Sequence, residues 1–373
     1  MSSINSEIDL SQEIQKIILD GMEMELKMPP KDTIQNRIKC WLDSTSFAEF
    51  TAAISERVKG QDRLNDVLAC VYIYLKNIAE GNTYKSNVLI SAPSGCGKTE
   101  TFRALRDYFS EEIPKLPIYQ IDMTQITEEG FKGHDTNDIV KPLFDKYTDG
   151  IAIVFLDELD KKLLPSYDNN RNDVNAAVQS QILTLIEGRE VISKEDSDLH
   201  INTANTMFIG CGSFNHMREV KQRESDKHSI GFNLEEKKKA DHYDDITMKD
   251  VIDQGASYEL LGRFALLVNY HKLSEDAINS IVDDMVEKVG KGLGIEIVVS
   301  DKMREQLQES ANSEYGCRRI MSIIQETTMR PYIGLLNKGK SLDRFCIVLE
   351  EIGWAHTKRI KNCKRELAEA SSQ

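Results

Sequence analysis

The sequence predicts an α/β protein in which a parallel central sheet is covered by helices and is followed by a smaller, mostly α-helical domain. Two observations support this. Short, wholly apolar runs recur between helical stretches, which is typical of strands buried on both faces. The runs stop near residue 270, and apolar residues then follow helical spacing. The chain has 373 residues, more than one core of about 100–200 usually needs, so two domains are expected.

The residues before the first apolar run are predicted to be helical. Residues 8–26 carry apolar side chains at mixed three- and four-residue spacings, which indicates an amphipathic helix. The prolines at positions 29 and 30 end it. Further helices are expected over about 32–54 and 61–79.

The apolar runs give the expected strands of the sheet, and two later runs give strand candidates in the smaller domain. The stretch 219–245 is dense in charge and lacks periodicity, so an exposed loop with some helix is expected there. The sheet strands are expected at 87–91, 118–123, 151–156, 207–210 and 265–268, and the later candidates at 295–299 and 345–349.

These patterns divide the chain into four parts. Residues 1–45 form an N-terminal helical segment of unknown role, and residues 46–269 form the large α/β domain. Residues 270–355 form the small α-rich domain, and residues 356–373 form a C-terminal tail.

Composition narrows the class of protein. Hydrophobic residues make up 40% and charged residues 29%, which excludes disorder as the dominant state. The longest apolar runs are about six residues, too short to span a membrane. The N-terminus has no basic region leading into an apolar stretch, so no secretory signal is expected and the cytoplasm is the expected location.

Charge and cysteine usage bear on partners and metals. Lys and Arg total 47 against 61 Asp and Glu, and the net charge of −14 works against nucleic acid as a partner. The seven cysteines form no Cys-x-x-Cys pair, so neither a zinc site nor a disulfide framework is predicted.

A phosphate-binding loop is predicted at residues 92–99. The sequence Ala-Pro-Ser-Gly-Cys-Gly-Lys-Thr follows the strand at 87–91 and precedes a helix-compatible stretch, the context that such a loop needs. Small residues let backbone N–H groups converge on phosphate oxygens, Lys98 reaches the β- and γ-phosphates, and the Thr99 hydroxyl ligates Mg²⁺. Position 92 is Ala where the strict pattern has Gly. The cofactors expected are therefore ATP and Mg²⁺, and the residues expected to hold the nucleotide here are Pro93, Ser94, Gly95, Cys96, Gly97, Lys98, Thr99 and Glu100.

Two adjacent acids follow the buried strand at 151–156. Asp157 can hold Mg²⁺, and Glu158 is placed to orient or deprotonate the attacking water. A solvated acidic turn is the alternative. The phosphate-binding loop earlier in the chain favours the catalytic interpretation.

On these motifs, residues 58–349 resemble the AAA+ ATPases, a group of P-loop NTPases, and within them the ClpX family of Clp protease unfoldase subunits. Residues 156–161 resemble the family's extended Walker B motif, and residues 185–188 resemble the end of the helix that follows it. The resemblance implies an AAA+ domain followed by a smaller lid domain. It places Val58 and the residues up to Gln61 beside the adenine.

The resemblance also implies three residues that respond to the nucleotide. Ser213 stands nearest the sensor 1 position, at the end of the run 207–214. Arg263, in Glu-Leu-Leu-Gly-Arg-Phe, resembles an arginine finger that a neighbouring subunit supplies. Arg318, in Tyr-Gly-Cys-Arg-Arg-Ile, resembles the sensor 2 arginine of the lid, and Arg319 is the alternative if the register differs by one.

Two further segments resemble the parts of the family that handle protein. The first, Gly130-Phe131-Lys132-Gly133, resembles the axial pore loop, in which an aromatic side chain grips polypeptide. Lys132 stands where the family usually has an aliphatic residue, and a packed loop aromatic is the alternative role for Phe131. The second, Ile230-Gly231-Phe232, resembles the loop that docks on a ClpP peptidase ring. A loop folded back onto its own domain is the alternative.

The sequence departs from the family in two places. Residues 1–45 contain one cysteine, Cys40, so the family's zinc-binding N-terminal domain is not expected. Between residues 187 and 207 the chain lacks the family's basic pore-entrance loop and carries acidic residues instead.

The function expected from the resemblance is an ATPase that unfolds protein substrates and threads them through a ring. Catalysis is expected to depend on Lys98, Glu158 and Arg263, and a homohexamer is expected because Arg263 completes a site only across a subunit boundary. The expected partners are unfolded or tagged proteins and a ClpP-type peptidase. No peptidase constellation is visible in this chain. A stand-alone remodelling ATPase and, less favoured by the charge, a nucleic-acid motor on the same fold are the alternatives.

Overall fold

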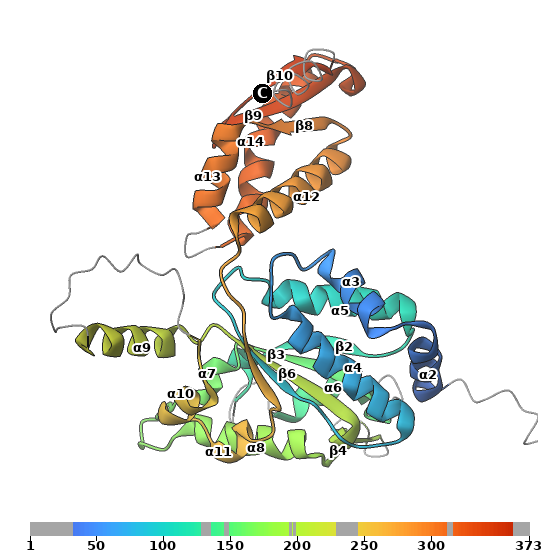
Figure 1. Cartoon of the computed structure of the whole chain (residues 1–373), viewed down its shortest axis with the longest axis vertical. Coiled ribbons are helices and arrows are strands. Elements are labelled where there is room, and N and C mark those ends of the chain that lie inside the picture. The colour runs from blue at the N-terminus through green and yellow to red at the C-terminus, as the bar shows by residue number, and fades with distance from the viewer. Residues whose placement is uncertain are drawn as a thin grey trace, which may run out of the picture.

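The computed structural model of the chain contains a large α/β domain and a smaller domain joined to it by a short extended segment (Figure 1). It describes residues 33–127, 136–144, 149–193, 196, 199–228, 245–311 and 316–360, apart from the side chains of 222 and 224–228. The helix expected at 8–26 therefore lies outside the described residues.

The large domain is organised around a five-stranded parallel sheet with the order β2-β3-β6-β1-β7. Each of the five predicted strands is present within a few residues of its expected bounds, which confirms the predicted central sheet. The strands are β1 (Val88–Ser91), β2 (Ile118–Asp122), β3 (Ala152–Asp157), β6 (Thr206–Gly212) and β7 (Leu266–Asn269).

Helices cover both faces of this sheet. Along β3, Ile153 and Phe155 belong to one buried cluster, whereas Val154 and Leu156 belong to another, because side chains alternate between the faces of a strand. The first cluster is closed by α2 (Ile34–Ser44), α3 (Phe47–Ser55), α4 (Leu64–Glu80) and α5 (Lys98–Glu112). The second is closed mainly by α6 (Lys141–Phe144), α7 (Asp160–Leu163), α8 (Val174–Glu187), α10 (Met248–Asp253) and α11 (Tyr258–Leu261).

The helical stretch expected at 32–54 consists of two helices. Ser46 interrupts it because its side chain and that of Glu49 form a capping box, which starts α3. Trp41 of α2 packs its ring against Phe50 and Phe109, with centroids 5.4 and 5.2 Å away. Helix α2 thus belongs to the core of the large domain, although the sequence placed residues up to 45 in a separate segment.

Several short elements complete the large domain. The stretch expected to be loop with some helix begins with α9 (Asn215–His228), and residues 229–244 lie outside the described residues. An antiparallel pair, β4 (Glu190–Ile192) and β5 (His200–Asn202), was not predicted. The described part of the large domain also contains the 3₁₀ helices η1 (Met123–Gln125), η2 (Thr136–Val140) and η3 (Thr203–Asn205), while η4 (Leu342–Arg344) belongs to the small domain.

The small domain packs three helices against a three-stranded sheet with the order β10-β9-β8. The strands β8 and β9 confirm the two strand candidates of this region, whereas β10 was not predicted and includes residues 356–359, which were assigned to the tail. The elements are α12 (Glu275–Leu293), β8 (Glu296–Val299), α13 (Asp301–Ala311), α14 (Arg318–Asn337), β9 (Phe345–Glu351) and β10 (Trp354–Arg359).

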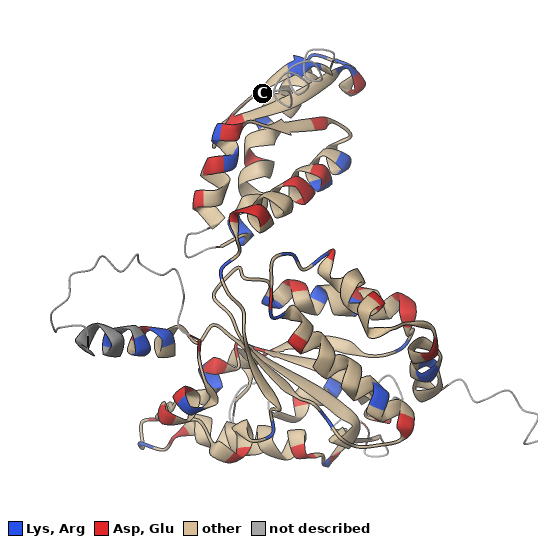
Figure 2. Ribbon diagram, in the orientation of Figure 1, with Lys and Arg blue, Asp and Glu red and all other residues tan. Residues whose placement is uncertain are grey.

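Charged residues of both signs are interspersed along the outer helices, while the central strands carry few (Figure 2). Among the described residues, no helix combines the length and the apolar character needed to cross a membrane.

Candidate functional site

The residues predicted to bind nucleotide gather at one edge of the central sheet. The register pairs Ser91 with Gly212 and with Asn269, and it pairs Asp122 with Asp157. All of these residues are at the carboxyl ends of parallel strands. This edge is where α/β proteins of this kind bind their ligands.

The predicted phosphate-binding loop connects β1 to α5 at this edge. Gly95 and Gly97 have φ values of +79° and +96°, in the left-handed region that favours glycine. Gly97 is the N-cap of α5, a helix of 15 residues that begins at Lys98, and Thr99 lies in its first turn. The loop therefore presents backbone N–H groups and a helix N-terminus, a combination that binds anions.

Lys98 and Glu100, both in this first turn, have different environments. The Lys98 ammonium is buried and donates to the carbonyls of Ala92 and Pro93, at 2.5 and 3.2 Å. Burial lowers the pKa of Lys98, and the Asp157 and Glu158 carboxylates partly oppose that shift. Glu100 instead forms an ion pair with Arg57 at 2.9 Å, which ties α5 to the segment before Val58.

The two predicted acids differ in their surroundings. Asp157 ends β3, and its carboxylate accepts hydrogen bonds from the Gln120 amide at 2.5 Å and from the Glu158 N–H at 3.0 Å. Glu158 has a φ of +56°, a strained value for a side chain other than glycine. Burial raises the pKa of Glu158, and the neighbouring carboxylates of Asp160 and Asp157 raise it further. A half-buried carboxyl group with a raised pKa at the end of a strand is suited to accept a proton.

Asp160, which the sequence analysis did not single out, joins this segment to the end of β6. It is 3% exposed, and its Oδ2 accepts from the Ser213 hydroxyl at 3.2 Å and from the Phe214 N–H at 2.9 Å. A Cβ at Gly212 would lie 2.7 Å from the Asp160 side chain, so this contact requires glycine. Ser213, the residue that the sequence analysis predicted for sensor 1, is thus held by Asp160 at the end of β6.

Val58 and Gln61 lie beside the phosphate-binding loop. A Cβ at Gly97 would lie 3.8 Å from each of their side chains. The Gln61 amide nitrogen donates to the Cys96 carbonyl of the loop and to the His271 carbonyl, both at 2.9 Å, whereas its buried oxygen has no partner among the described residues. Gln61 therefore joins the loop directly to the segment that leads into the small domain.

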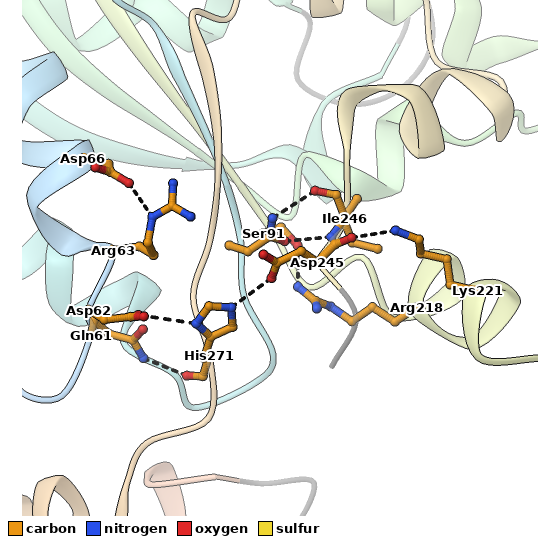
Figure 3. Close-up of polar contacts among 11 residues, drawn as sticks. Gln61, Asp62, Arg63, Asp66, Ser91, Arg218, Lys221, Asp245, Ile246 and His271 are labelled. Atoms are coloured by element: carbon orange, nitrogen blue, oxygen red, sulfur yellow. Dashed lines mark hydrogen bonds and ion pairs between the residues drawn. The ribbon is translucent and has the colours of Figure 1, made fainter. Parts of the chain in front are cut away.

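His271 in that segment contacts two carboxylates (Figure 3). Its Nδ1 lies 3.4 Å from Asp62 and its Nε2 lies 2.8 Å from Asp245. The backbone of Asp245 is in turn fixed by Lys221 of α9, which donates to its carbonyl at 2.7 Å. This segment between β7 and the small domain is the hinge. His271 thus connects the hinge to the residues before α4 and to those before α10. No motif in the sequence indicated this arrangement.

Arg218 was also not predicted. It is 5% exposed and comes from α9, as Figure 3 shows, and it donates to the Ser91 hydroxyl at 2.5 Å and to the Ser213 carbonyl at 3.3 Å. A buried guanidinium therefore connects the end of β1, where the phosphate-binding loop starts, with the end of β6.

The small domain meets the nucleotide loops at two glycines. A Cβ at Gly95 would lie 2.6 Å from the Gly316 Cα, and a Cβ at Gly60 would lie 2.4 Å from the Ala277 Cβ. Arg318 is exposed in the first turn of α14, two residues after Gly316. The predicted sensor 2 segment thus begins directly against the phosphate-binding loop, and Arg319, also exposed, follows in the same turn.

Arg263 lies at the opposite edge of the sheet. Its carbonyl accepts from the side chain of Asn87, the residue before β1, at 3.1 Å. Four strand residues separate that point from the phosphate-binding loop, about 13 Å along the strand. The guanidinium is half-exposed and pairs with Glu187, the last residue of α8, at 2.5 Å. Arg263 is therefore not part of the phosphate site of its own chain.

The predicted pore and docking segments cannot be placed. Gly130, Phe131, Lys132 and Gly133 lie outside the described residues, and so do Ile230, Gly231 and Phe232.

The donor set at the carboxyl edge fits Mg²⁺ bound together with phosphates. The Thr99 hydroxyl and the Asp157 carboxylate are hard oxygen donors, which this ion prefers. No group of three or more His, Cys, Asp or Glu side chains among the described residues could hold a metal by itself. Such a site therefore relies on phosphate oxygens and water for its remaining ligands, as Mg²⁺–nucleotide sites commonly do.

Comparisons with known proteins agree with this architecture. Residues 83–267 match the family model described as AAA domain (Cdc48 subfamily), and residues 273–344 match that of the C-terminal, D2-small domain, of ClpB protein. The ATP-dependent Clp protease ATP-binding subunit ClpX of Treponema denticola is 25% identical over 313 residues, which cover 74% of each chain.

The fold and the site define a nucleotide-binding ATPase of the AAA+ class, with its AAA domain in the large domain described above. Within that class the chain is similar to the Clp-type ATPases, ClpX among them. This confirms the resemblance found in the sequence and the predicted fold class.

The contact between the two glycines yields a first prediction. In Gly316→Ala, the new Cβ would lie 2.7 Å from Gly95 Cα and Ser94 O, at a φ of +55°, so the lid segment must move away from the loop. We expect ATP affinity, measured by isothermal titration, to fall about tenfold or more, equivalent to about 1.4 kcal/mol.

Gly334→Ala is the matched control for this variant. Gly334 lies within α14 and has open space where the Cβ would go. We expect its ATP affinity to match wild type. Its stability should not fall, because alanine is about 1 kcal/mol more favourable than glycine inside a helix. Equal affinities in the two variants would show that the glycine contact does not shape the nucleotide site.

Proposed function

We propose that this protein is an ATP-dependent unfoldase and translocase that works as a homohexameric ring, and that it serves as the ATP-binding subunit of a Clp-type protease. Its substrates would be unfolded or tagged proteins. The relative from Treponema denticola bears the name of such a subunit, and the AAA+ class supplies the ATPase. The peptidase would be a separate, ClpP-type chain that operates in the same compartment, the cytoplasm.

The observation that carries this proposal is the position of Arg263. It lies at the edge of the sheet opposite the phosphate-binding loop of its own chain, yet its guanidinium is half-exposed. An arginine that stabilises phosphoryl transfer must touch the transferring group. Arg263 can meet this requirement only in the site of a neighbouring subunit, so the complete site needs a ring or another repeating assembly.

Each residue at the carboxyl edge of the sheet has a separate role in ATP hydrolysis. The loop 93–97 and the α5 N-terminus bind the phosphates, and Lys98 neutralises charge on the β- and γ-phosphates. Thr99 and Asp157 would hold Mg²⁺, which when bound polarises the phosphates and offsets their charge. Glu158 orients the attacking water and takes its proton. Ser213, held by Asp160, contacts the γ-phosphate region.

Nucleotide binding also involves the small domain. Arg318 extends from the α14 turn that follows Gly316, which contacts Gly95, and it senses the γ-phosphate. Gln61 joins the loop to the hinge at His271. Hydrolysis therefore changes the contacts that hold the two domains together. Rotation of the small domain would move Phe131 along the ring axis and pull the substrate, and residues 230–232 would dock on the peptidase.

The shared site can be tested with two inactive variants. We expect Glu158→Gln to lower ATP turnover by about 10²–10⁴ through loss of the base, and Arg263→Ala to lower it by about 10³–10⁵ through loss of the finger. When the two variants are mixed, turnover should partly return, because some sites then combine an intact Glu158 with the intact Arg263 of a neighbour.

The turnover of the mixture shows whether the active site is shared between subunits. The Lys98→Ala and Glu158→Gln pair is the control, since both changes fall in the same site and mixing cannot restore it. If Arg263→Ala keeps wild-type turnover, or if its mixture with Glu158→Gln stays inactive, the shared site is disproved.

The protein-directed activity requires a separate prediction. Phe131→Ala should lower the ATP-dependent unfolding of a tagged fluorescent protein about tenfold or more while ATP turnover stays near wild type, because an aromatic side chain supplies the apolar grip. Loss of substrate fluorescence with time is the measurement. Equal unfolding rates for Phe131→Ala and wild type would contradict the pore-loop role, and no unfolding by wild type would contradict the proposed function.

The electrostatics of Glu158 predict the pH dependence. Glu158 must be ionised to accept a proton, and its pKa is raised by burial, by Asp160 and by Asp157, so turnover should be lost at a higher pH than for an ordinary carboxyl group. Asp160→Asn removes one negative charge, so the pKa of Glu158 falls and the acid limb of kcat/KM moves to lower pH. The new amide oxygen can still accept from Phe214.

The control for this shift is Asp253→Asn, which changes an exposed acid in α10. We expect its pH profile to match wild type. An acid limb that stays in place in a folded Asp160→Asn protein would rule out Glu158 as the titrating base.

A further inference from the structure

Gln179 in α8 lies between two parts of the molecule that serve different active sites. It is 2% exposed. Its amide nitrogen donates to the Lys162 carbonyl at 2.9 Å, and its amide oxygen accepts from the Ser257 N–H at 2.7 Å. Both ends of one buried amide are thus occupied by backbone groups far apart in the sequence.

The first of these backbone groups belongs to the segment of the catalytic acids. Lys162 lies in α7, a helix of four residues that begins at Asp160, two residues after Glu158. The carbonyls of this segment are held by α8, since Asn175 also donates to Lys161 and Leu164, at 2.9 and 2.7 Å. Any movement of the catalytic segment must therefore shift these contacts with α8.

The second backbone group belongs to the segment that carries Arg263. Ser257 is the N-cap of α11, which ends at Leu261, two residues before Arg263. Leu260 and Leu261 are buried in the same cluster as Leu159, Leu163 and the apolar face of α8. The N–H that Gln179 holds is thus the start of a short, tightly packed segment that positions the finger.

Helix α8 also reaches the guanidinium of Arg263. Glu187, at its C-terminal end, pairs with Arg263 at 2.5 Å. That end is fixed in turn by Lys85, whose ammonium donates to the Ile186 carbonyl at 2.5 Å and to the Thr203 carbonyl at 3.1 Å. Glu187 follows Gln179 by eight positions, about 12 Å of helix. The helix is therefore a rigid connection along which both contacts move together.

We propose that Gln179 is a positioning residue that couples the nucleotide state of its own subunit to the placement of Arg263, and thus to catalysis in the neighbouring subunit. The Gln179 amide hydrogen-bonds to Lys162 and Ser257 at the same time. If Lys162 moves, Ser257 must move with it or one of the two buried hydrogen bonds breaks, which costs free energy. The inference rests on the proposed function, since it assumes that Arg263 acts in a neighbour's site.

Mixed assemblies of the full chain test the coupling. Wild-type subunits are mixed at increasing ratios with Glu158→Gln subunits, which hold ATP, and turnover is measured per wild-type subunit at saturating ATP. We expect this turnover to fall about twofold or more at equal ratio, because subunits that stay in the ATP state alter the finger that they present. When the added subunits also carry Gln179→Met, turnover per wild-type subunit should stay constant, since methionine fills the space but makes neither hydrogen bond.

The matched control separates coupling from stability. Val178→Ala changes the preceding, fully buried residue of α8 and removes core packing without touching either hydrogen bond. Added in combination with Glu158→Gln, it should lower the melting temperature of the subunit yet give the same mixing curve as Glu158→Gln alone. This curve reports on a neighbour's wild-type site, so mere destabilisation of the added subunit does not reproduce the effect of Gln179→Met.

The outcomes distinguish failure of this inference from failure of the proposed function. If the Glu158→Gln, Gln179→Met double variant follows the Glu158→Gln curve, Gln179 does not carry the coupling, and the inference is overturned. If Arg263→Ala subunits keep wild-type turnover, the shared site itself is absent and the proposed function fails as well.

Discussion

The single direction of the five parallel strands constrains everything else in this protein. Residues that follow strands gather at one edge of the sheet, and residues that precede strands gather at the other. The phosphate-binding loop and Ser213 follow strands and Asp157 ends one, whereas Arg263 precedes β7 and contacts Asn87 before β1. No local rearrangement can bring these groups together in one chain, because the strands between them are buried and hydrogen-bonded on both sides. Arg263 therefore cannot contact a nucleotide that is bound to the phosphate-binding loop of its own chain.

A second constraint links the two domains. Close contacts of Gly95 with the Gly316 backbone and of Gly60 with the Ala277 side chain leave no space for a further side chain, so the small domain meets the nucleotide loops directly. Gln61 and His271 add hydrogen bonds across the hinge that follows β7. Contacts of this kind transmit small displacements, because packed backbone cannot absorb them by rotating a side chain. A displacement of the nucleotide loops is therefore passed directly to the small domain.

The sequence predicted those parts whose signals are local. Residues 92–99 and the acids at 157 and 158 are recognisable because a strand, a tight turn and a functional side chain occur within about ten residues. Asp160 with Ser213 and Arg218 with Ser91 join positions 53 and 127 residues apart, which no local pattern encodes. Helix α2 was separated from the large domain because its burial depends on packing against α4. The strands β4 and β5 have only three residues each, too few for a period to be read.

Three of the residues that the sequence analysis missed share one physical property: they are polar and almost completely buried. Asp160, Gln179 and Arg218 are all at most 5% exposed, in places where apolar side chains would pack with less desolvation cost. Asp160 fixes the segment after β6 to its own segment, whereas Gln179 and Arg218 each fix groups of two other segments in place. Apolar replacements could fill the same volume, but they would allow these segments to slide, since apolar packing has little directional preference. In the assembly proposed above, where the chemistry of one subunit would depend on an arginine from the next, such directional control offsets the cost of burying these polar groups.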